Sequence, residues 1–406
     1  MPTSNVLESA AQQIPDGQVT RQILPVVGFT FVAYFSIGVP LALLPTYAHL
    51  QLGVSPTIAG LLVSLQYVAT FASRPRAGRM ADTQGPRQTV RYGLLCCAAS
   101  GFFLLLAGLL RHLFWLCIGS LVLSRLLLGV GESMSSTGST MWGIGRVGIE
   151  RTSRVISWNG VATYLALAVG APVGVLLGAR WGFVGVGLLI LLVGIISYVV
   201  ATGMASTAPV KGNPTAVPLG KILLHVTPYG LALALGGMGF GIIGTFITLY
   251  FFHRGWQGAA LSLTIYGLSF MGVRLVFPRV IERVGGFPVA IVSLVAEAAG
   301  LLLLAFGNTA GWAHAGCGLA GLGFSLVFPA LAVEAAKAFP TSVRGSVLGV
   351  YTAFIDLSLF LSGPLAGTII HLYGYQTAFL FIVGAVLLAL ALSIWLSISD
   401  KSSVAA

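Results

Sequence analysis

The sequence alternates between long apolar runs and short polar segments, and this alternation limits the folds that are open to the chain. Each run is long enough, at 1.5 Å per helical residue, to cross a hydrocarbon layer of about 30 Å. The runs predict membrane-spanning helices near residues 23–48, 57–74, 89–110, 114–138, 157–178, 183–205, 224–252, 259–277, 287–307, 314–334, 346–371 and 376–398.

The composition excludes a soluble globule. Of the 406 residues, 57% are hydrophobic and only 8% are charged, whereas soluble chains carry about 25% charged residues. Lipid must therefore solvate most of the surface. We predict an all-α membrane protein with twelve transmembrane helices.

The basic residues predict the orientation of the chain. Arg111, Arg180 and Arg254 fall on one side and Arg125 lies within a span, which leaves 17 of the 21 lysines and arginines on the side of both termini. By the positive-inside rule, both termini are cytoplasmic. The net charge of +11 then faces anionic lipid, and we expect no nucleic-acid partner. The seven tryptophans lie near span ends and are interpreted as interfacial anchors.

An internal repeat divides the chain into two similar halves. The segment Gly129-Val-Gly131 matches Gly321-Leu-Gly323, and Ala171-Pro172 matches Gly363-Pro364, each at an offset of 192. The segment 206–223 contains three prolines and no apolar periodicity, so we interpret it as a linker. The predicted organisation is a tail at 1–22, a six-helix bundle at 23–205, the linker 206–223, a second bundle at 224–398 and a tail at 399–406. Two facing bundles predict a cavity near the membrane midplane.

A second pattern repeats in the predicted loops. Gly78, Asp82, Gly85 and Arg87 lie in a basic segment between the second and third spans. A weaker copy, Glu282-Arg283-Val-Gly285, occurs 200 positions later in the same setting. This spacing also favours a duplicated bundle.

Three charged residues within the spans are candidates for function, because a charge in the membrane costs several kcal/mol unless it is paired. Glu132 follows Arg125 by two helical turns, so it could neutralise Arg125 directly or through water. Asp356 lies two turns before Gly363-Pro364 and could face the other bundle. A purely structural buried pair is the alternative for Arg125 and Glu132. For Glu297 in the ninth span we expect a hydrogen-bonded structural role.

These features resemble the Major Facilitator Superfamily over essentially the whole chain. The resemblance implies two pseudo-symmetric six-helix bundles and a latch that holds them together in the outward-open state. In this latch Asp82 accepts hydrogen bonds from helix N-terminal amides and cytoplasmic arginines, while Gly78 allows close helix approach. Arg125 to Gly131 is similar to the fourth-span motif, whose arginine is linked to proton transfer in drug exporters. Gly170, Pro172 and Gly174 are similar to the fifth-span antiporter motif, and Gly363 and Pro364 are its counterpart in the second half.

A narrower resemblance concerns four segments, including 65–75 and 323–331. They look like the YhhS-like branch of bacterial inner-membrane facilitators, which implies efflux, although that branch is expected to have a neutral amide at Glu132. Tyr34, Gln66 and Asn159 are further polar candidates for the cavity. No phosphate-binding loop, metal-ligand spacing or catalytic constellation stands in a polar segment, so we predict no enzyme activity, no metal and no cofactor.

Together these patterns predict a secondary transporter that exports a small organic solute or drug in exchange for protons, by alternating access. The first alternative is a symporter or uniporter that imports a sugar or organic acid. The second is a receptor or scaffold that does not transport. The expected partners are a small-molecule substrate, protons and membrane lipid, with a monomer in the bacterial inner membrane.

Overall fold

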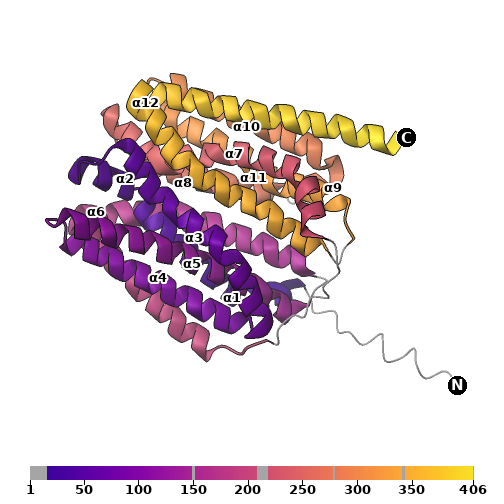
Figure 1. The fold of residues 1–406 in the computed structure, drawn as a ribbon, viewed down its shortest axis with the longest axis horizontal. Helices are drawn as coiled ribbons and strands as arrows, with labels where there is room; N and C mark the ends of the chain where they lie inside the picture. The colour runs from indigo at the N-terminus through magenta and orange to yellow at the C-terminus, as the bar shows by residue number, and fades with distance from the viewer. Residues whose placement is uncertain (1–15, 149–150, 208–217, 278, 341–342, 406) are drawn as a thin grey trace.

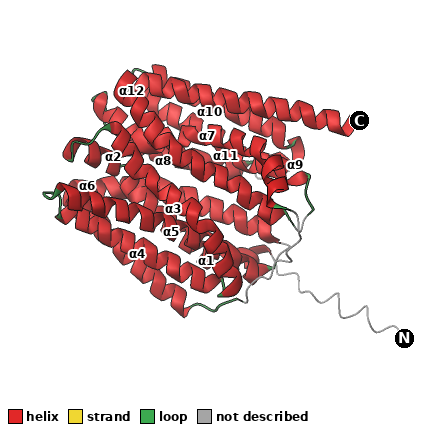
Figure 2. Cartoon of the chain, viewed as in Figure 1, coloured by secondary structure: helices red, strands yellow, loops and turns green. Residues whose placement is uncertain are grey.

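A computed structural model describes residues 16–148, 151–207, 218–277, 279–340 and 343–405 (Figure 1). Within these ranges the chain is almost entirely helical and holds no strand (Figure 2). The elements are α1 (Asp16–Leu41), α2 (Leu44–Thr46), the π-helix η1 (Tyr47–Gln51), α3 (Pro56–Thr83), α4 (Pro86–Leu109), α5 (Phe114–Val147), α6 (Thr152–Gly203), α7 (Leu219–His253), α8 (Ala259–Val276), α9 (Val280–Val284), α10 (Gly286–Phe306), α11 (Ala310–Lys337) and α12 (Arg344–Ala405).

Ten helices in the described ranges are long and apolar enough to cross a membrane. Two of them, α6 and α12, each contain a sharp turn at a glycine with non-helical backbone angles, Gly182 (φ 57°) and Gly374 (φ 83°). The chain reverses direction at both glycines (Figure 1). In α6, for example, the part before Gly182 packs on α1 and the part after it packs on α4. Each long helix therefore supplies two crossings, and the predicted fold class of twelve spanning helices is confirmed.

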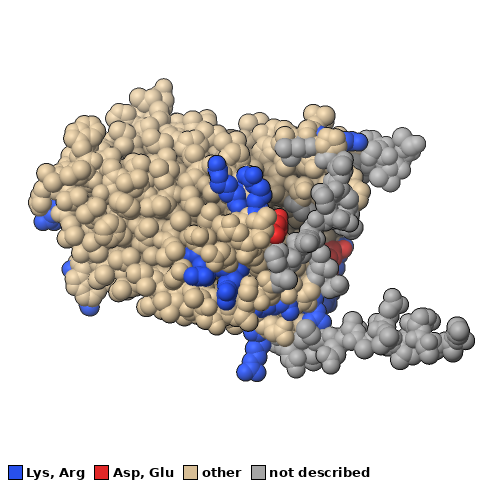
Figure 3. Space-filling model, turned by 60° about the horizontal axis from the view of Figure 1, so that its bottom comes forward, with Lys and Arg blue, Asp and Glu red and all other residues tan. Residues whose placement is uncertain are grey.

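The crossings form two bundles, α1 to α6 and α7 to α12 (Figure 1). We call the end where α1 and α7 begin and α6 and α12 finish the linker end, and the other the hairpin end. Basic side chains cluster towards the linker end (Figure 3). Most of the predicted tail 1–22 and linker 206–223 lies outside the described residues, whereas the predicted tail 399–406 continues α12 as far as Ala405.

Helices extend beyond the apolar runs at the linker end. α3 continues to Thr83 and α5 to Val147, although the apolar runs predicted ends at 74 and 138. The prediction that Gly78 and Asp82 lie in a loop is therefore wrong. The length of an apolar run indicates only the part of a helix that lies in the membrane. The helix itself continues into water until it reaches a residue that ends it. Gly85 stops α3 with φ 96°, and its repeat, Gly285, has φ 95°, a conformation that favours glycine.

Close helix contacts confirm the internal repeat. A Cβ at Gly129 of α5 would meet the backbone of Gln66 in α3, and a Cβ at Gly321 of α11 would meet the backbone of Tyr266 in α8. Positions in α3 and α8 therefore correspond at an offset of 200, and positions in α5 and α11 at 192. The Ala171-Pro172 and Gly363-Pro364 match extends the offset of 192 to α6 and α12.

Trp142 departs from the expectation for the tryptophans. Its side chain is 0% exposed. The ring stacks on Phe29 with centroids 5.8 Å apart, and Nε1 donates to the Ala205 carbonyl at 3.1 Å. It lies near the end of an apolar run, but that part of α5 is covered by α1 and α6. The interpretation of Trp142 as an interfacial anchor is therefore wrong.

Candidate functional site between the bundles

The two bundles meet mainly along α3 with α12 and along α6 with α8. At the hairpin end they also touch through α2 and α7, where Thr46 donates to Thr248 at 3.3 Å. Thr57 and Thr368 are hydrogen-bonded there at 3.2 Å. No contact of comparable extent joins α5 to α11 in the described ranges. The bundles are thus held together most firmly at the hairpin end.

An ion pair links the bundles. Arg74 of α3 donates from Nη2 to Oδ1 of Asp356 in α12 at 2.8 Å, and its Nε also donates to Oδ2. The Asp356 side chain is 4% exposed and that of Arg74 is 26% exposed. A two-point contact between a guanidinium and a carboxylate fixes orientation as well as distance. This pair therefore ties α3 of the first bundle to α12 of the second in a defined geometry.

Glu132 of α5 lies beside this pair. It is 4% exposed and accepts a hydrogen bond from the Thr70 hydroxyl of α3 at 3.1 Å. Arg74, Asp356 and Tyr34 are its electrostatic neighbours. Two carboxylates therefore face one guanidinium, and Asp356 has the direct contact.

Arg125 is separate from Glu132. It is 2% exposed, and its one hydrogen bond to a described residue runs from Nη1 to Oε1 of Gln66 at 3.4 Å. Its Nε and Nη2 have no partner within the same ranges. The expected direct pairing with Glu132 is wrong, because two helical turns separate the residues by roughly 10 Å along the axis. Arg125 instead contacts Gln66 of α3, and Glu132 contacts Thr70 of α3 and Tyr34 of α1.

Arg274 of α8 also reaches the interface. Its guanidinium donates to the Ser325 carbonyl of α11 at 3.0 and 3.2 Å. The Cζ atom lies 4.7 Å from the ring centre of Phe270 and 5.8 Å from that of Tyr164, which belongs to α6 of the other bundle. Both distances allow a cation–π interaction.

The sequence predicted only some of this cluster. It singled out Glu132, Asp356 and Tyr34, which the structure brings together around Arg74. It also singled out Arg125 and Gln66, which contact each other. Asn159 stays within the first bundle, where it accepts from Thr30 at 2.5 Å and donates to the Val155 carbonyl at 3.1 Å.

Arg74 and Arg274 were missed, because both were counted as basic residues on the cytoplasmic side of the membrane. A usable signal was present, since the two arginines are separated by 200 positions, the offset of the loop repeat.

The predicted latch is open in this conformation. Asp82 is exposed and makes no ion pair with another described residue, and a Cβ at Gly78 would have no neighbour within 4 Å. Arg87 donates to the Met204 carbonyl at 3.0 Å, within its own bundle. Glu282 and Arg283 are exposed on α9. A latching role for this motif remains a prediction about another conformation.

The glycines of the antiporter-like motif pack closely, but mostly within one bundle. Gly170 lies against Gly38, and Gly174 against the Val39 carbonyl, both in α1. Gly363 packs across the bundles on Gly60 of α3. Pro172 and Pro364 lie within α6 and α12. In this conformation Gly170 and Gly174 therefore bring α6 close to α1, and not to the other bundle.

Two other acids lie outside the cluster. Glu297 is 0% exposed inside the second bundle, and neither carboxyl oxygen has a hydrogen-bond partner among the described residues. Its expected hydrogen-bonded role is not found. Glu334 accepts from the Gly286 amide at 2.8 Å and pairs with Lys337 at 2.5 Å. Glu334 is therefore a paired charge near the end of α11.

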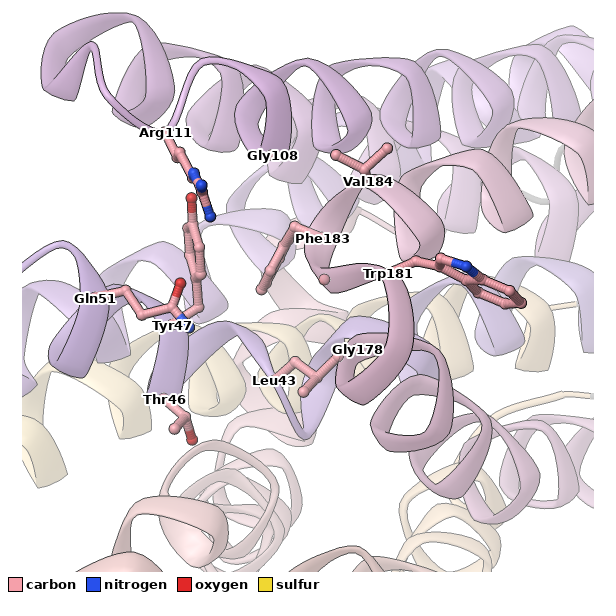
Figure 4. Close-up of a pocket in the computed structure, with 11 residues that line it drawn as sticks. Leu43, Thr46, Tyr47, Gln51, Gly108, Arg111, Gly178, Trp181, Phe183 and Val184 are labelled. Atoms are coloured by element: carbon pink, nitrogen blue, oxygen red, sulfur yellow. The ribbon is translucent and has the colours of Figure 1, made fainter.

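Two cavities lie at the hairpin end, away from the charged cluster. One of about 180 Å³ is lined by α2, η1, α4 and α6 and by the turn that follows α4, where Arg111 reaches towards Tyr47 (Figure 4). The other, of about 490 Å³, includes His49, His253 and His371 in its lining. Among the described residues no group of three His, Cys, Asp or Glu is arranged to hold a metal ion.

Comparison with known proteins agrees with this architecture. The sequence profile of the Major Facilitator Superfamily matches residues 26–363 and 288–405. An uncharacterized MFS-type transporter of Burkholderia pseudomallei (strain K96243) is 48% identical over 374 residues, covering 92% of this chain and 91% of that protein. One of Pseudomonas aeruginosa (strain UCBPP-PA14) is 47% identical over 393 residues, covering 97% and 96%.

Solved structures share the fold. A point mutant of the nucleoside transporter NupG has a TM-score of 0.74 at 15% identity and covers 92% of this chain and 99% of its own. The POT family transporter PepTSo has a TM-score of 0.72 at 12% identity, covering 94% and 98%. The chain therefore belongs to the Major Facilitator Superfamily, whose multi-pass membrane proteins carry small molecules across membranes by alternating access.

Proposed function

We propose that this protein is a proton-coupled transporter of a small organic solute, and that Glu132 takes up the transported proton. The observation that carries the proposal is the sharing of Arg74 by two buried carboxylates. Asp356 has the two-point contact with the guanidinium, whereas the hydrogen-bond partners of Glu132 are the neutral hydroxyls of Thr70 and Tyr34. The Glu132 carboxylate therefore has no ion pair with a described residue, and in surroundings of low polarity a proton neutralises it at the least cost.

The same contact offers a route from the proton to the conformation. Ionised Glu132 competes with Asp356 for Arg74, whereas neutral Glu132 leaves Arg74 to Asp356 and so strengthens the link between the bundles. A group that binds its proton differently in two conformations shifts the equilibrium between them. With the linker end cytoplasmic, as its basic residues favour, the conformation described here is the one closed towards the outside of the bacterial inner membrane.

Two couplings fit this arrangement. The fifth-span resemblance at Gly170, Pro172 and Gly174 favours exchange, in which protons enter and the solute is exported. Co-transport of a proton with the solute is the second candidate. The observation that favours it is the unmatched positive charge of Arg125, since an anion bound there is stabilised when Glu132 becomes neutral.

The test is accumulation of a pooled metabolite and drug panel in membrane vesicles, read by mass spectrometry with the proton gradient present or collapsed. Gradient-dependent accumulation in inverted vesicles indicates export by exchange, and accumulation in right-side-out vesicles indicates import. Accumulation that does not depend on the proton gradient in either kind of vesicle contradicts proton coupling. Glu334→Gln is the matched control, because Glu334 is a buried acid at a helix end outside the cluster.

A further inference from the structure

The two sides of the site differ in chemistry although they are related by the internal repeat. In the first bundle, Gln66 faces Arg125 and Thr70 faces Glu132. At the offsets of 200 and 192, Gln66 and Arg125 correspond to Tyr266 and Cys317. Thr70 and Glu132 correspond to Phe270 and Phe324, whose ring centres lie 6.2 Å apart. One face is polar and charged, and its counterpart is aromatic.

The polar face lacks a partner for a buried cation. Arg125 is 2% exposed, and its Nε and Nη2 have no acceptor among the described residues. The Nε2 donor of Gln66, beside it, also has none. A guanidinium presents its donors as a planar fork that matches a carboxylate at two points. Leaving such donors buried and unpaired is costly. The missing group is therefore an acceptor, and an anion fits it best.

The aromatic face consists of packed, buried rings, with Phe270 1% and Phe324 3% exposed. Phe270 stacks against Tyr164, and Phe240 and Tyr266 have ring centres 5.4 Å apart. The Tyr266 hydroxyl is buried without a partner in the described part of the chain, so it can donate to a polar atom on a ligand. Ligand sites generally combine such apolar walls with a few polar groups that fix orientation.

The charge balance sets the charge of the ligand. Arg74, Arg125 and Arg274 contribute three positive charges to the region between the bundles. Glu132 and Asp356 contribute two negative charges. One positive charge is in excess when both acids are ionised, and two are in excess when Glu132 is neutral. An anionic ligand is therefore favoured in both states.

We propose that the solute is a small organic monoanion with an aromatic ring. Its carboxylate binds Arg125 and Gln66, and its ring packs against Phe270 and Phe324. This inference rests on the proposed function only in that it assigns the solute to the same site. It makes co-transport with a proton the electrostatically favoured coupling, since a neutral Glu132 strengthens the attraction for the anion.

The test is equilibrium binding to the full chain in lipid nanodiscs, without any gradient. The probes are benzoate, phenylacetate and 3-phenylpropionate, with phenylacetamide, phenethylamine and acetate as the neutral, cationic and ringless comparisons. We expect at least one aromatic carboxylate to raise the thermal unfolding midpoint saturably while the comparison compounds do not. Equal or tighter binding of the amide or the amine overturns the proposal, and so does the absence of binding by all three carboxylates.

Variants separate a role in binding from one in folding. We expect Arg125→Gln to raise the Kd of the bound carboxylate at least about tenfold, and Arg125→Lys to raise it less, because lysine keeps the charge but loses the fork. Phe324→Leu should reduce the preference for phenylacetate over acetate. Arg111→Gln, at the hairpin end, is the matched control. An unchanged Kd in folded Arg125→Gln contradicts the assignment.

The outcomes for the solute and for proton coupling are distinct. Binding of an aromatic carboxylate with transport that ignores the proton gradient leaves the ligand class standing and removes the coupling proposal. Gradient-driven transport of a neutral or cationic compound supports the coupling proposal and removes the proposed ligand class.

Discussion

Tyr164 and Asp356 occupy equivalent positions in the two bundles, 192 residues apart, and each faces an arginine of the opposite bundle. The arginines, Arg274 and Arg74, are themselves equivalent at an offset of 200. The repeat has thus kept the same cross-bundle contact twice, once as an ion pair and once as a cation–π contact.

This relationship predicts the effect of restoring the symmetry. Tyr164→Asp should give Arg274 a carboxylate where Arg74 already has one, and a second ion pair should stabilise the conformation described here. We expect transport turnover to fall several-fold and the thermal unfolding midpoint to rise. Tyr164→Phe keeps the ring and is the matched control. A variant that turns over as fast as the natural protein would show that the two contacts are not equivalent.

Breaking the ion pair should destabilise the protein by leaving one charge buried. Removal of one partner of a buried pair costs about 3 kcal/mol, so we expect Arg74→Gln and Asp356→Asn each to lower the unfolding midpoint. The double variant should recover part of that loss, because neither charge then remains unmatched. A double-mutant cycle in nanodiscs measures the coupling, and additive effects would mean that the contact contributes nothing.

The hairpin end should be closed in this conformation and open in another. Thr46 and Thr248 have hydroxyl oxygens 3.3 Å apart across the bundles, so cysteines at both positions, in a background without Cys96, Cys97, Cys117 and Cys317, should form a disulfide. We expect oxidation to stop transport and a reductant to restore it. Either single cysteine variant is the control. Full transport by the oxidised protein would contradict alternating access at this end.

The close packing of α6 on α1 predicts that a methyl group added at this contact destabilises the protein, whereas one added at an open glycine does not. A Cβ at Gly174 would overlap the Val39 carbonyl, whereas one at Gly384 would meet nothing within 4 Å. Overpacking costs about 1–3 kcal/mol, so Gly174→Ala should lower the unfolding midpoint. Gly384→Ala should leave it unchanged or raise it, since alanine favours a helix over glycine. Equal effects would show that α1 can move away from α6 without cost.

Much of the fold could be predicted from the sequence. Each membrane crossing requires a long apolar run, and the similarity of the two halves is visible as a repeat of residues. The site was less predictable. Arg74 and Arg274 lie at the ends of apolar runs, where an arginine in the interface looks the same as one in water. The partner of Glu132 was also missed, since Thr70 belongs to another helix and spacing along α5 pointed to Arg125.

If Glu132 couples the proton to the solute, its removal should separate two modes of transport in proteoliposomes. The solute identified in vesicles is measured in two modes, net transport driven by an imposed pH gradient and exchange of labelled for unlabelled solute without a gradient. We predict that Glu132→Gln keeps exchange and loses gradient-driven transport, while Glu334→Gln keeps both. Gradient-driven transport by Glu132→Gln at the natural rate would contradict the account.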